Sequence, residues 1–352
     1  MELREPGPVP AGRRLRLIER PDPDPGPGEV LLEVAACAVC RTDLQIVEGD
    51  LPARRLPIVP GHQVVGRVVA HGAGVDGAAL PIGTRVGVAW TAGCCGACRH
   101  CRTGRENLCE DLLFTGWDRD GGFATAMTAR ADFVHRLPEG FDDLAAAPLL
   151  CGGTIGYRSL RVAGIDLARA AGTRLGLYGF GASATIVIQL AVHAGCDVHV
   201  STRSVAEQQA ALAMGAAWAG GYDERPPVPL DAAITFAPSG DVVVAALAAL
   251  DRGGVLAINA IHLDRIPEFD YDLLWLERQI RSVANVTRAD VREFLALAAE
   301  IPIRTRTEVL PLAEANTALA RLRAGDIAGA AVLAAQNSTV ANVPTVSNPT
   351  RR

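Results

Sequence analysis

The sequence lacks three features that would assign it to a specialised class of protein. It has no excess of basic residues of the kind that nucleic-acid-binding proteins show, and its formal net charge is −5. It has no run of 18 or more apolar residues, so we expect no membrane-spanning helix. Its first residues are charged and proline-rich and contain no apolar stretch of a secretory signal, so we expect a cytoplasmic protein. Neither nucleic acid nor a membrane is therefore expected among its partners.

The composition is that of a globular protein with more than one core. Hydrophobic residues make up 49% of the chain and charged residues 21%, which are ordinary values for soluble proteins. A chain of 352 residues exceeds the usual size of a single hydrophobic core, so we expect two domains. Nine cysteines without an export signal predict reduced thiols, which are available as metal ligands.

Two regions of different character follow each other along the chain. Residues 28–136 consist of short β-rich runs separated by glycine and proline, which predicts an irregular β domain. From residue 173 to 285, predicted strands alternate with predicted helices, as in a parallel, doubly wound sheet. The first four elements of this alternation are a strand at 174–178, a helix ending at 194, a strand at 198–202 and a helix at 204–214. The polar residues 336–352 are predicted to be a disordered tail.

Four closely spaced cysteines predict a metal site. They are Cys95, Cys98, Cys101 and Cys109. Four thiolates around one Zn²⁺ form a closed, structural site, and Gly96 and Gly104 allow the chain to turn around it. Buried cysteines or an iron–sulfur centre are the alternatives, but buried cysteines do not normally recur at three-residue steps in a polar, glycine-rich loop. Cys94 adjoins the set without keeping its even spacing.

Three other residues, considered together with this cluster, are candidates for a second metal site. They are Cys40 in Ala-Val-Cys-Arg-Thr-Asp, His62 in Gly-His-Gln-Val-Val-Gly and Cys151 in Leu-Leu-Cys-Gly-Gly-Thr. Together with the four-cysteine cluster they resemble the ligands of medium-chain zinc-dependent alcohol dehydrogenases, and in particular a bacterial branch described as propanol-preferring. The resemblance extends from Gly28 to about Leu333. It implies that this trio binds a catalytic Zn²⁺ and leaves one position open for water or a substrate oxygen.

The same resemblance suggests roles for the residues that follow Cys40. Thr42 matches the hydroxyl that hydrogen-bonds the alcohol and passes its proton onward. Asp43 matches a carboxylate that orients the ligating histidine. Arg41 matches a residue that meets the cofactor pyrophosphate in some members. The sequence departs from the family pattern at Gln63, where many members have glutamate, and at Gln45, where a second proton-relay residue is often histidine.

A glycine-rich turn predicts the dinucleotide site. It follows the predicted strand at 174–178 directly and opens a helix, and it consists of Gly179, Phe180, Gly181, Ala182, Ser183 and Ala184. This is the pattern GxGxxG/A: Gly179 permits the tight turn, Gly181 the close approach of the pyrophosphate, and Ala184 close helix packing. The phosphates are expected at the helix N-terminus.

The preference between NAD and NADP stays open. The strand that follows ends in Thr202 and Arg203, where an acidic residue would bind the ribose 2′-hydroxyl of NAD. The absence of the acid and the presence of a cation favour NADP, whereas the family resemblance favours NAD. The alternative for Arg203 is that it only covers the adenine.

Two tryptophans, Trp90 and Trp117, are candidate walls of the substrate pocket. Bulky walls would favour small primary alcohols as substrates; the alternative is that both side chains are buried in the core.

We therefore predict an α/β protein with a β-rich GroES-like catalytic domain at 1–153 and 287–335, and a Rossmann domain with a doubly wound parallel sheet at 154–286. The predicted function is interconversion of alcohols with aldehydes or ketones by NAD(P)-linked hydride transfer, with two Zn²⁺ per subunit. Alternatives are an NADPH-dependent aldehyde reductase and a non-enzymatic zinc- and dinucleotide-binding module. The resemblance implies a homodimer or homotetramer.

Overall fold

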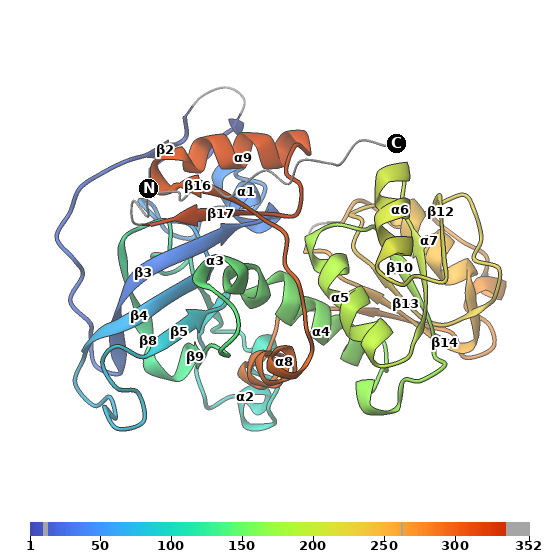
Figure 1. The fold of residues 1–352 in the computed structure, drawn as a ribbon, viewed down its shortest axis with the longest axis horizontal. Helices are drawn as coiled ribbons and strands as arrows, with labels where there is room; N and C mark the ends of the chain where they lie inside the picture. The colour runs from blue at the N-terminus through green and yellow to red at the C-terminus, as the bar shows by residue number, and fades with distance from the viewer. Residues whose placement is uncertain (10–12, 262, 336–352) are drawn as a thin grey trace, which may run out of the picture.

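The computed structural model describes residues 1–9, 13–261 and 263–335. The predicted tail at 336–352 lies outside these residues. Two sheets form the two halves of the molecule, and helices α4 (Gly152–Val162) and α8 (Arg288–Glu300) lie between them (Figure 1). In the described part of the chain, no helix is long and apolar enough to cross a membrane.

The first sheet has seven strands and joins distant parts of the chain. Its main path runs β16-β17-β3-β4-β5-β9, and β8 pairs with β3. Its strands are β3 (Glu29–Val39), β4 (Gln63–His71), β5 (Arg85–Val88), β8 (Ala126–Arg130), β9 (Val134–Arg136), β16 (Thr307–Pro311) and β17 (Ala330–Ala334). The predicted β-rich region therefore takes up the end of the described chain, because β17 pairs antiparallel with β3.

The second sheet has six strands, and all its pairs are parallel. The order is β12-β11-β10-β13-β14-β15. The strands are β10 (Arg174–Tyr178), β11 (Asp197–Ser201), β12 (Trp218–Gly220), β13 (Leu230–Thr235), β14 (Leu250–Ile258) and β15 (Gln279–Ser282). The order reverses between β10 and β13, which is where ligands bind in open sheets of this type. The prediction of an α/β protein with a doubly wound sheet is confirmed.

The helices of this half agree with the sequence pattern. α5 (Ala182–His193) follows β10 and α6 (Val205–Ala213) follows β11, each close to its predicted position. α7 (Gly240–Ala248) links β13 to β14. β10 is buried along nearly its whole length, as expected for a parallel strand that has helices on both faces.

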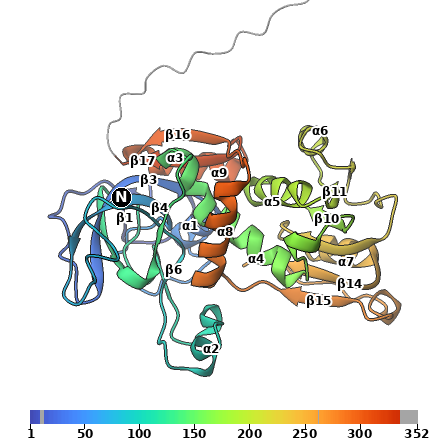
Figure 2. The same cartoon turned by 60° about the horizontal axis from the view of Figure 1, so that its bottom comes forward.

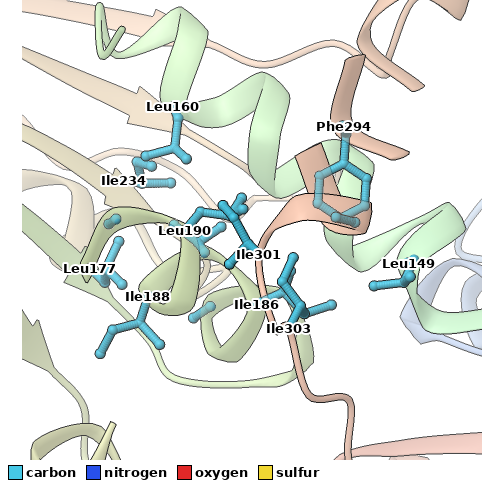
Figure 3. Packing of buried hydrophobic residues seen from close by; sticks show 14 of the residues in the cluster. Leu149, Leu160, Leu177, Ile186, Ile188, Leu190, Ile234, Phe294, Ile301 and Ile303 are labelled. Carbon is cyan, nitrogen blue, oxygen red and sulfur yellow. The ribbon is translucent and has the colours of Figure 1, made fainter. Parts of the chain in front are cut away.

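One apolar core continues from the second sheet into the first half of the molecule. Leu177 of β10 and Ile186 of α5 belong to the same buried cluster as Leu149, Phe294 and Ile303 (Figure 3). Each fully buried leucine or isoleucine contributes roughly 1.5–3 kcal/mol to stability. This shared core fixes where the start of α4 lies relative to the parallel sheet.

Candidate functional site

The four cysteines lie in a lobe that projects from the first half of the molecule. Between β6 (Thr91–Gly93) and β7 (Leu113–Phe114) the chain leaves the sheet and forms α2 (Arg99–Arg102), which stands away from the body of the molecule (Figure 2). The turns at Gly96 and Gly104 have φ values of 70° and 67°, a region that favours glycine. The lobe is therefore built almost entirely by local turns.

The sulfur atoms of the lobe are spaced as a tetrahedral zinc site requires. Cys95 Sγ lies 3.9 Å from Cys101 Sγ and 3.5 Å from Cys109 Sγ, and Cys98 Sγ lies 3.5 Å from Cys101 Sγ. Zn–S bonds of about 2.3 Å in a tetrahedron place sulfurs about 3.8 Å apart. Backbone N–H groups of Ala97 and Cys98 lower the pKa of Cys95 to about 7, which favours the thiolate. The four donors therefore fit Zn²⁺.

The predicted catalytic trio also comes together in space, although its members come from three separate segments. Cys40 caps the N-terminus of α1 (Arg41–Glu48), His62 directly precedes β4, and Cys151 directly precedes α4. Cys40 Sγ lies 3.3 Å from His62 Nε2, and the three ligand atoms lie within 4.8 Å of one another. Three donors so arranged leave a fourth tetrahedral position, as in catalytic zinc sites.

Asp43 holds two members of the trio in place. Its side chain is completely buried, and its Oδ1 lies 2.9 Å from His62 Nδ1. Oδ1 also accepts a hydrogen bond from Gly61 N, and Oδ2 accepts one from Cys40 N. Burial opposes protonation of His62, but the charges of Asp43 and Cys40 raise its pKa well above the ordinary value. With Nδ1 engaged by the carboxylate, Nε2 is the ring nitrogen that faces Cys40.

The two departures from the family pattern occupy different environments. Gln63 is 3% exposed, and its Nε2 is buried without a hydrogen-bond partner among the described residues. Gln45 lies on α1 and is half-buried.

The two residues that follow Cys40 differ in exposure. Thr42 is buried, and its backbone N–H donates to Cys40 Sγ. Arg41, the first residue of α1, is exposed.

The two tryptophans lie at different depths behind the trio. The ring of Trp90 is centred 6.0 Å from that of His62 and 6.3 Å from that of Trp117. Trp117 is 9% exposed, and its Nε1 donates to Pro52 O. Trp90 therefore adjoins the trio, whereas Trp117 forms a layer behind it.

The glycine-rich turn lies where the sequence pattern predicts, between β10 and α5. Gly179 has a φ of 94°, and a Cβ there would lie 3.1 Å from Ala237 N. A Cβ at Gly181 would meet no atom within 4 Å, so this glycine borders open space. Ala184 is fully buried against the core, and Phe180 is 4% exposed. Ala182, the first residue of α5, is exposed.

The start of α5 also approaches the trio. A Cβ added at Gly152 would lie 3.4 Å from Ser183 Oγ, and Gly152 is the neighbour of Cys151. The fold therefore places Ser183 of the glycine-rich turn beside Gly152, the neighbour of Cys151.

One acid near the end of β11 was not singled out in the sequence: Glu207, in the first turn of α6. Glu207 accepts a hydrogen bond from the Thr202 hydroxyl, while Arg203 is exposed. The missed signal was the spacing Ser204-x-x-Glu207, typical of a helix N-terminus. Thr202 itself is 2% exposed.

Sequence reasoning also missed the attachment of the cysteine lobe to the segment that enters α8. Asn107 Nδ2 donates to Ala284 O over 2.8 Å, and Arg288 N donates to Glu106 Oε1 over 3.0 Å. Asn285 has a φ of 53° in the left-handed region, and its Nδ2 donates to Thr91 Oγ1. No spacing rule in the sequence links residues so far apart.

Comparisons with known proteins agree with this geometry. Residues 26–139 match the family model of the alcohol dehydrogenase GroES-like domain. The chain is 52% identical over 336 residues to the probable alcohol dehydrogenase AdhA of Mycobacterium tuberculosis (strain CDC 1551 / Oshkosh), covering 94% of this chain and 96% of that protein.

Solved structures show the same fold. A cinnamyl alcohol dehydrogenase from Sorghum bicolor superposes with a TM-score of 0.84 at 26% identity, over 95% of this chain and 97% of that one. A cobalt- and zinc-bound thermostable alcohol dehydrogenase from Pyrobaculum aerophilum superposes with a TM-score of 0.82 at 26% identity, over 95% and 98%. The chain therefore belongs to the medium-chain, zinc-dependent alcohol dehydrogenases, which interconvert alcohols with aldehydes or ketones.

Proposed function

We propose that Cys40, His62 and Cys151 hold the catalytic Zn²⁺, and that the four lobe cysteines hold a second, structural Zn²⁺. The observation that carries the first assignment is the 2.9 Å contact between Asp43 Oδ1 and His62 Nδ1, because it leaves Nε2 directed at Cys40. A catalytic Zn²⁺ polarises the substrate oxygen and favours the alkoxide form of an alcohol.

Thr42 is proposed as the residue that receives the alcohol proton. Thr42 lies two residues after Cys40, at the buried start of α1, and this position supports the role. The next relay position holds Gln45, whose amide does not titrate near neutral pH. A proton that leaves Thr42 therefore has no acid or base to accept it at residue 45.

The residues 179–184 are proposed to hold the pyrophosphate of the dinucleotide, with Arg41 as a further contact. The N-terminus of α5 presents backbone N–H groups there, a favourable environment for phosphate. The proximity of Gly152 to Ser183 supports a cofactor that extends from this turn toward Cys151. The Rossmann domain is proposed to comprise 154–286, and the catalytic domain 1–153 and 287–335.

The identity of the dinucleotide is proposed from the end of β11. Arg203 is exposed, and Glu207 already accepts the hydrogen bond of the Thr202 hydroxyl. We propose that Arg203 accommodates the 2′-phosphate of NADP. An Arg203→Asp variant is expected to lower the ratio of kcat/KM with NADP to that with NAD by roughly tenfold or more. An unchanged ratio would exclude Arg203 as the determinant.

The substrate is proposed to be a small primary alcohol or the corresponding aldehyde. Trp90 supports this, since its ring is centred 6.0 Å from that of His62 and leaves little room on that side of the trio. Turnover with ethanol, propanol and longer alcohols, and with their aldehydes, is measured with each dinucleotide. Absence of turnover across this panel, in protein shown to contain two zinc ions per chain, would overturn the proposal. A preference for aldehyde reduction with NADPH would favour the reductase alternative.

We also propose a cytoplasmic homodimer or homotetramer. Within the part of the chain that the structure describes, β15 pairs only with β14, so its other edge is available to a strand of a second copy. Large hydrophobic side chains are exposed in the same part of the chain, at Ile261, Tyr271 and Trp275. Sedimentation velocity tests the assembly, and a monomer at micromolar concentration would contradict it.

A further inference from the structure

A cavity lies between β9 and α8, at residues assigned neither to the catalytic trio nor to the dinucleotide turn. Its volume is about 680 Å³, within the range of small-molecule sites. Three segments line it: the loop 75–80, residues 131–138 around β9, and the face of α8 at 292–299. We call it the β9–α8 cavity.

Much of the wall of the β9–α8 cavity is apolar. Leu80 and Leu295 are buried, and Val134 and Leu137 are half-buried. The exposed face of α8 contributes only the small side chains of Ala296 and Ala299 between Arg292 and the end of the helix. An apolar body of ligand size therefore finds a matching surface here.

The polar groups of the cavity have unused hydrogen-bonding capacity. His135 is 5% exposed and makes no side-chain hydrogen bond to any described residue, although it lines the cavity. The Arg292 guanidinium has neither an ion pair nor a hydrogen bond among the described residues. Arg136 donates to the carbonyl of Ala79 and has no carboxylate partner in the described chain. These side chains line the cavity, so a ligand that enters it can pair with them.

The acids of the cavity do not supply these partners. Asp132 pairs with Arg130 and Arg288, which neutralise its charge. Asp76 accepts hydrogen bonds from the backbone of its own turn, at Ala78 and Ala79. Asp76 keeps its charge, because backbone hydrogen bonds do not cancel it. Two arginines, Arg136 and Arg292, stand against this one carboxylate, so the net charge at the cavity is positive.

We propose that the β9–α8 cavity binds an organic carboxylate with an apolar body of medium length, such as an aliphatic monocarboxylate. Arg292 pairs with the carboxylate, His135 hydrogen-bonds it, and the leucines and Val134 contact the hydrocarbon. Arginine matches carboxylate geometry with two parallel hydrogen bonds. Burial, Arg292 and Arg288 lower the pKa of His135 to about 4, so its ring is neutral at pH 7 and can hydrogen-bond the carboxylate without adding charge.

The test is a titration of the zinc-loaded, full-length protein with octanoate, followed by NMR of labelled leucine and valine methyl groups. We expect saturable shifts at Leu80, Val134, Leu137 and Leu295. A carboxylate is also an acceptable zinc ligand, so shifts confined to Val39 and Leu44, which flank Cys40, would mean zinc coordination alone and overturn the proposal.

Variants separate charge from shape. Arg292→Gln is expected to weaken octanoate binding about tenfold, and 1-octanol is expected to bind wild type at least tenfold more weakly than octanoate does. Arg252→Gln, at an exposed position outside the cavity, is the matched control and is expected to bind like wild type. Ala296→Phe should block the cavity from its exposed side and abolish the methyl shifts that octanoate causes in wild type. Equal affinity of wild type and Arg292→Gln, or of octanoate and octanol, would overturn the proposal.

Discussion

The two proposed zinc sites, the lobe cysteines and the trio, offer similar donors but are built in opposite ways. The lobe collects four sulfurs from residues 95–109, and Cys95 is exposed. The trio collects one ligand from each of three segments, around a completely buried His62. A local cluster can form once its own turns form, whereas the trio exists only when α1, β4 and α4 are packed together.

The groups that surround the two sites also differ: local backbone groups surround the lobe sulfurs, whereas a buried carboxylate supports the trio. Around the lobe sulfurs the donors are backbone N–H groups of neighbouring residues, such as that of Cys98 to Cys95 Sγ. In the trio a buried carboxylate, Asp43, orients His62 and holds the backbone of Cys40. A closed site needs only to be stable, but an open site must also keep its free position directed at the substrate.

The largest loss of activity is expected when one proposed ligand of the trio is removed. Cys151→Ala should lower kcat/KM roughly 10³-fold, because the metal supplies several kcal/mol of transition-state stabilisation. Zinc content should fall from two ions to one per chain while the melting temperature stays close to that of wild type. The control is Cys196→Ala, a buried cysteine outside both clusters, with activity near wild type. Retention of more than a tenth of the activity by Cys151→Ala would refute its role as a ligand.

Asp43→Asn tests the orienting carboxylate without changing the shape of the side chain. We expect kcat/KM to fall about 10- to 100-fold, as is typical when the partner of a metal-bound histidine is lost. Metal affinity, measured by competition with a chelator, should fall in parallel at the trio but not at the lobe. Asp142→Asn, an exposed cap of α3 (Asp143–Ala146), serves as the control. Unchanged kinetics in Asp43→Asn would mean that the His62 contact does not tune the site.

Cys98→Ala should affect stability far more than chemistry. With one lobe ligand lost, we expect the melting temperature to fall by roughly 5–10 °C, while kcat/KM of the folded enzyme changes less than about threefold. Calorimetry and initial rates on the same preparation measure both quantities. If Cys98→Ala lost activity as completely as Cys151→Ala without a loss of stability, the proposed division between the two clusters would be wrong.

The smallest effect is expected from the attachment of the lobe. Asn107→Ala leaves the carbonyl of Ala284 without its side-chain partner and should cost about 1 kcal/mol, or roughly 2–4 °C in melting temperature. Thr103→Ala removes an exposed hydrogen bond within the lobe and should have little effect. An equal shift in both variants would show that the attachment adds nothing specific to stability.

Much of the architecture could be predicted from local patterns. The elements β10, α5, β11 and α6 lie close to their predicted positions, because alternating apolar runs and glycine turns are properties of short segments. The same applies to the cysteine lobe, whose spacing is a local rule. The trio was predicted by resemblance and not by its geometry, since residues 40, 62 and 151 follow no spacing rule of their own.

Other features became visible only in the folded molecule. The hydroxyl of Thr202 donates to Glu207, and Asn107 donates to the carbonyl of Ala284, 177 residues further along the chain. Trp90 and Trp117 were equivalent candidates in the sequence, yet only Trp90 adjoins His62. The β9–α8 cavity joins segments separated by more than a hundred residues, so no local pattern could indicate it.

By itself the sequence determined the donor chemistry, the local turns and the order of strands and helices, because these depend on residue type and short-range spacing. The tertiary structure decided which donors face one another, which of them a carboxylate orients, and which arginines stay without a partner. Those outcomes depend on packing between distant segments, where one buried contact, such as that of Asp43 with His62, fixes what the same residue types do.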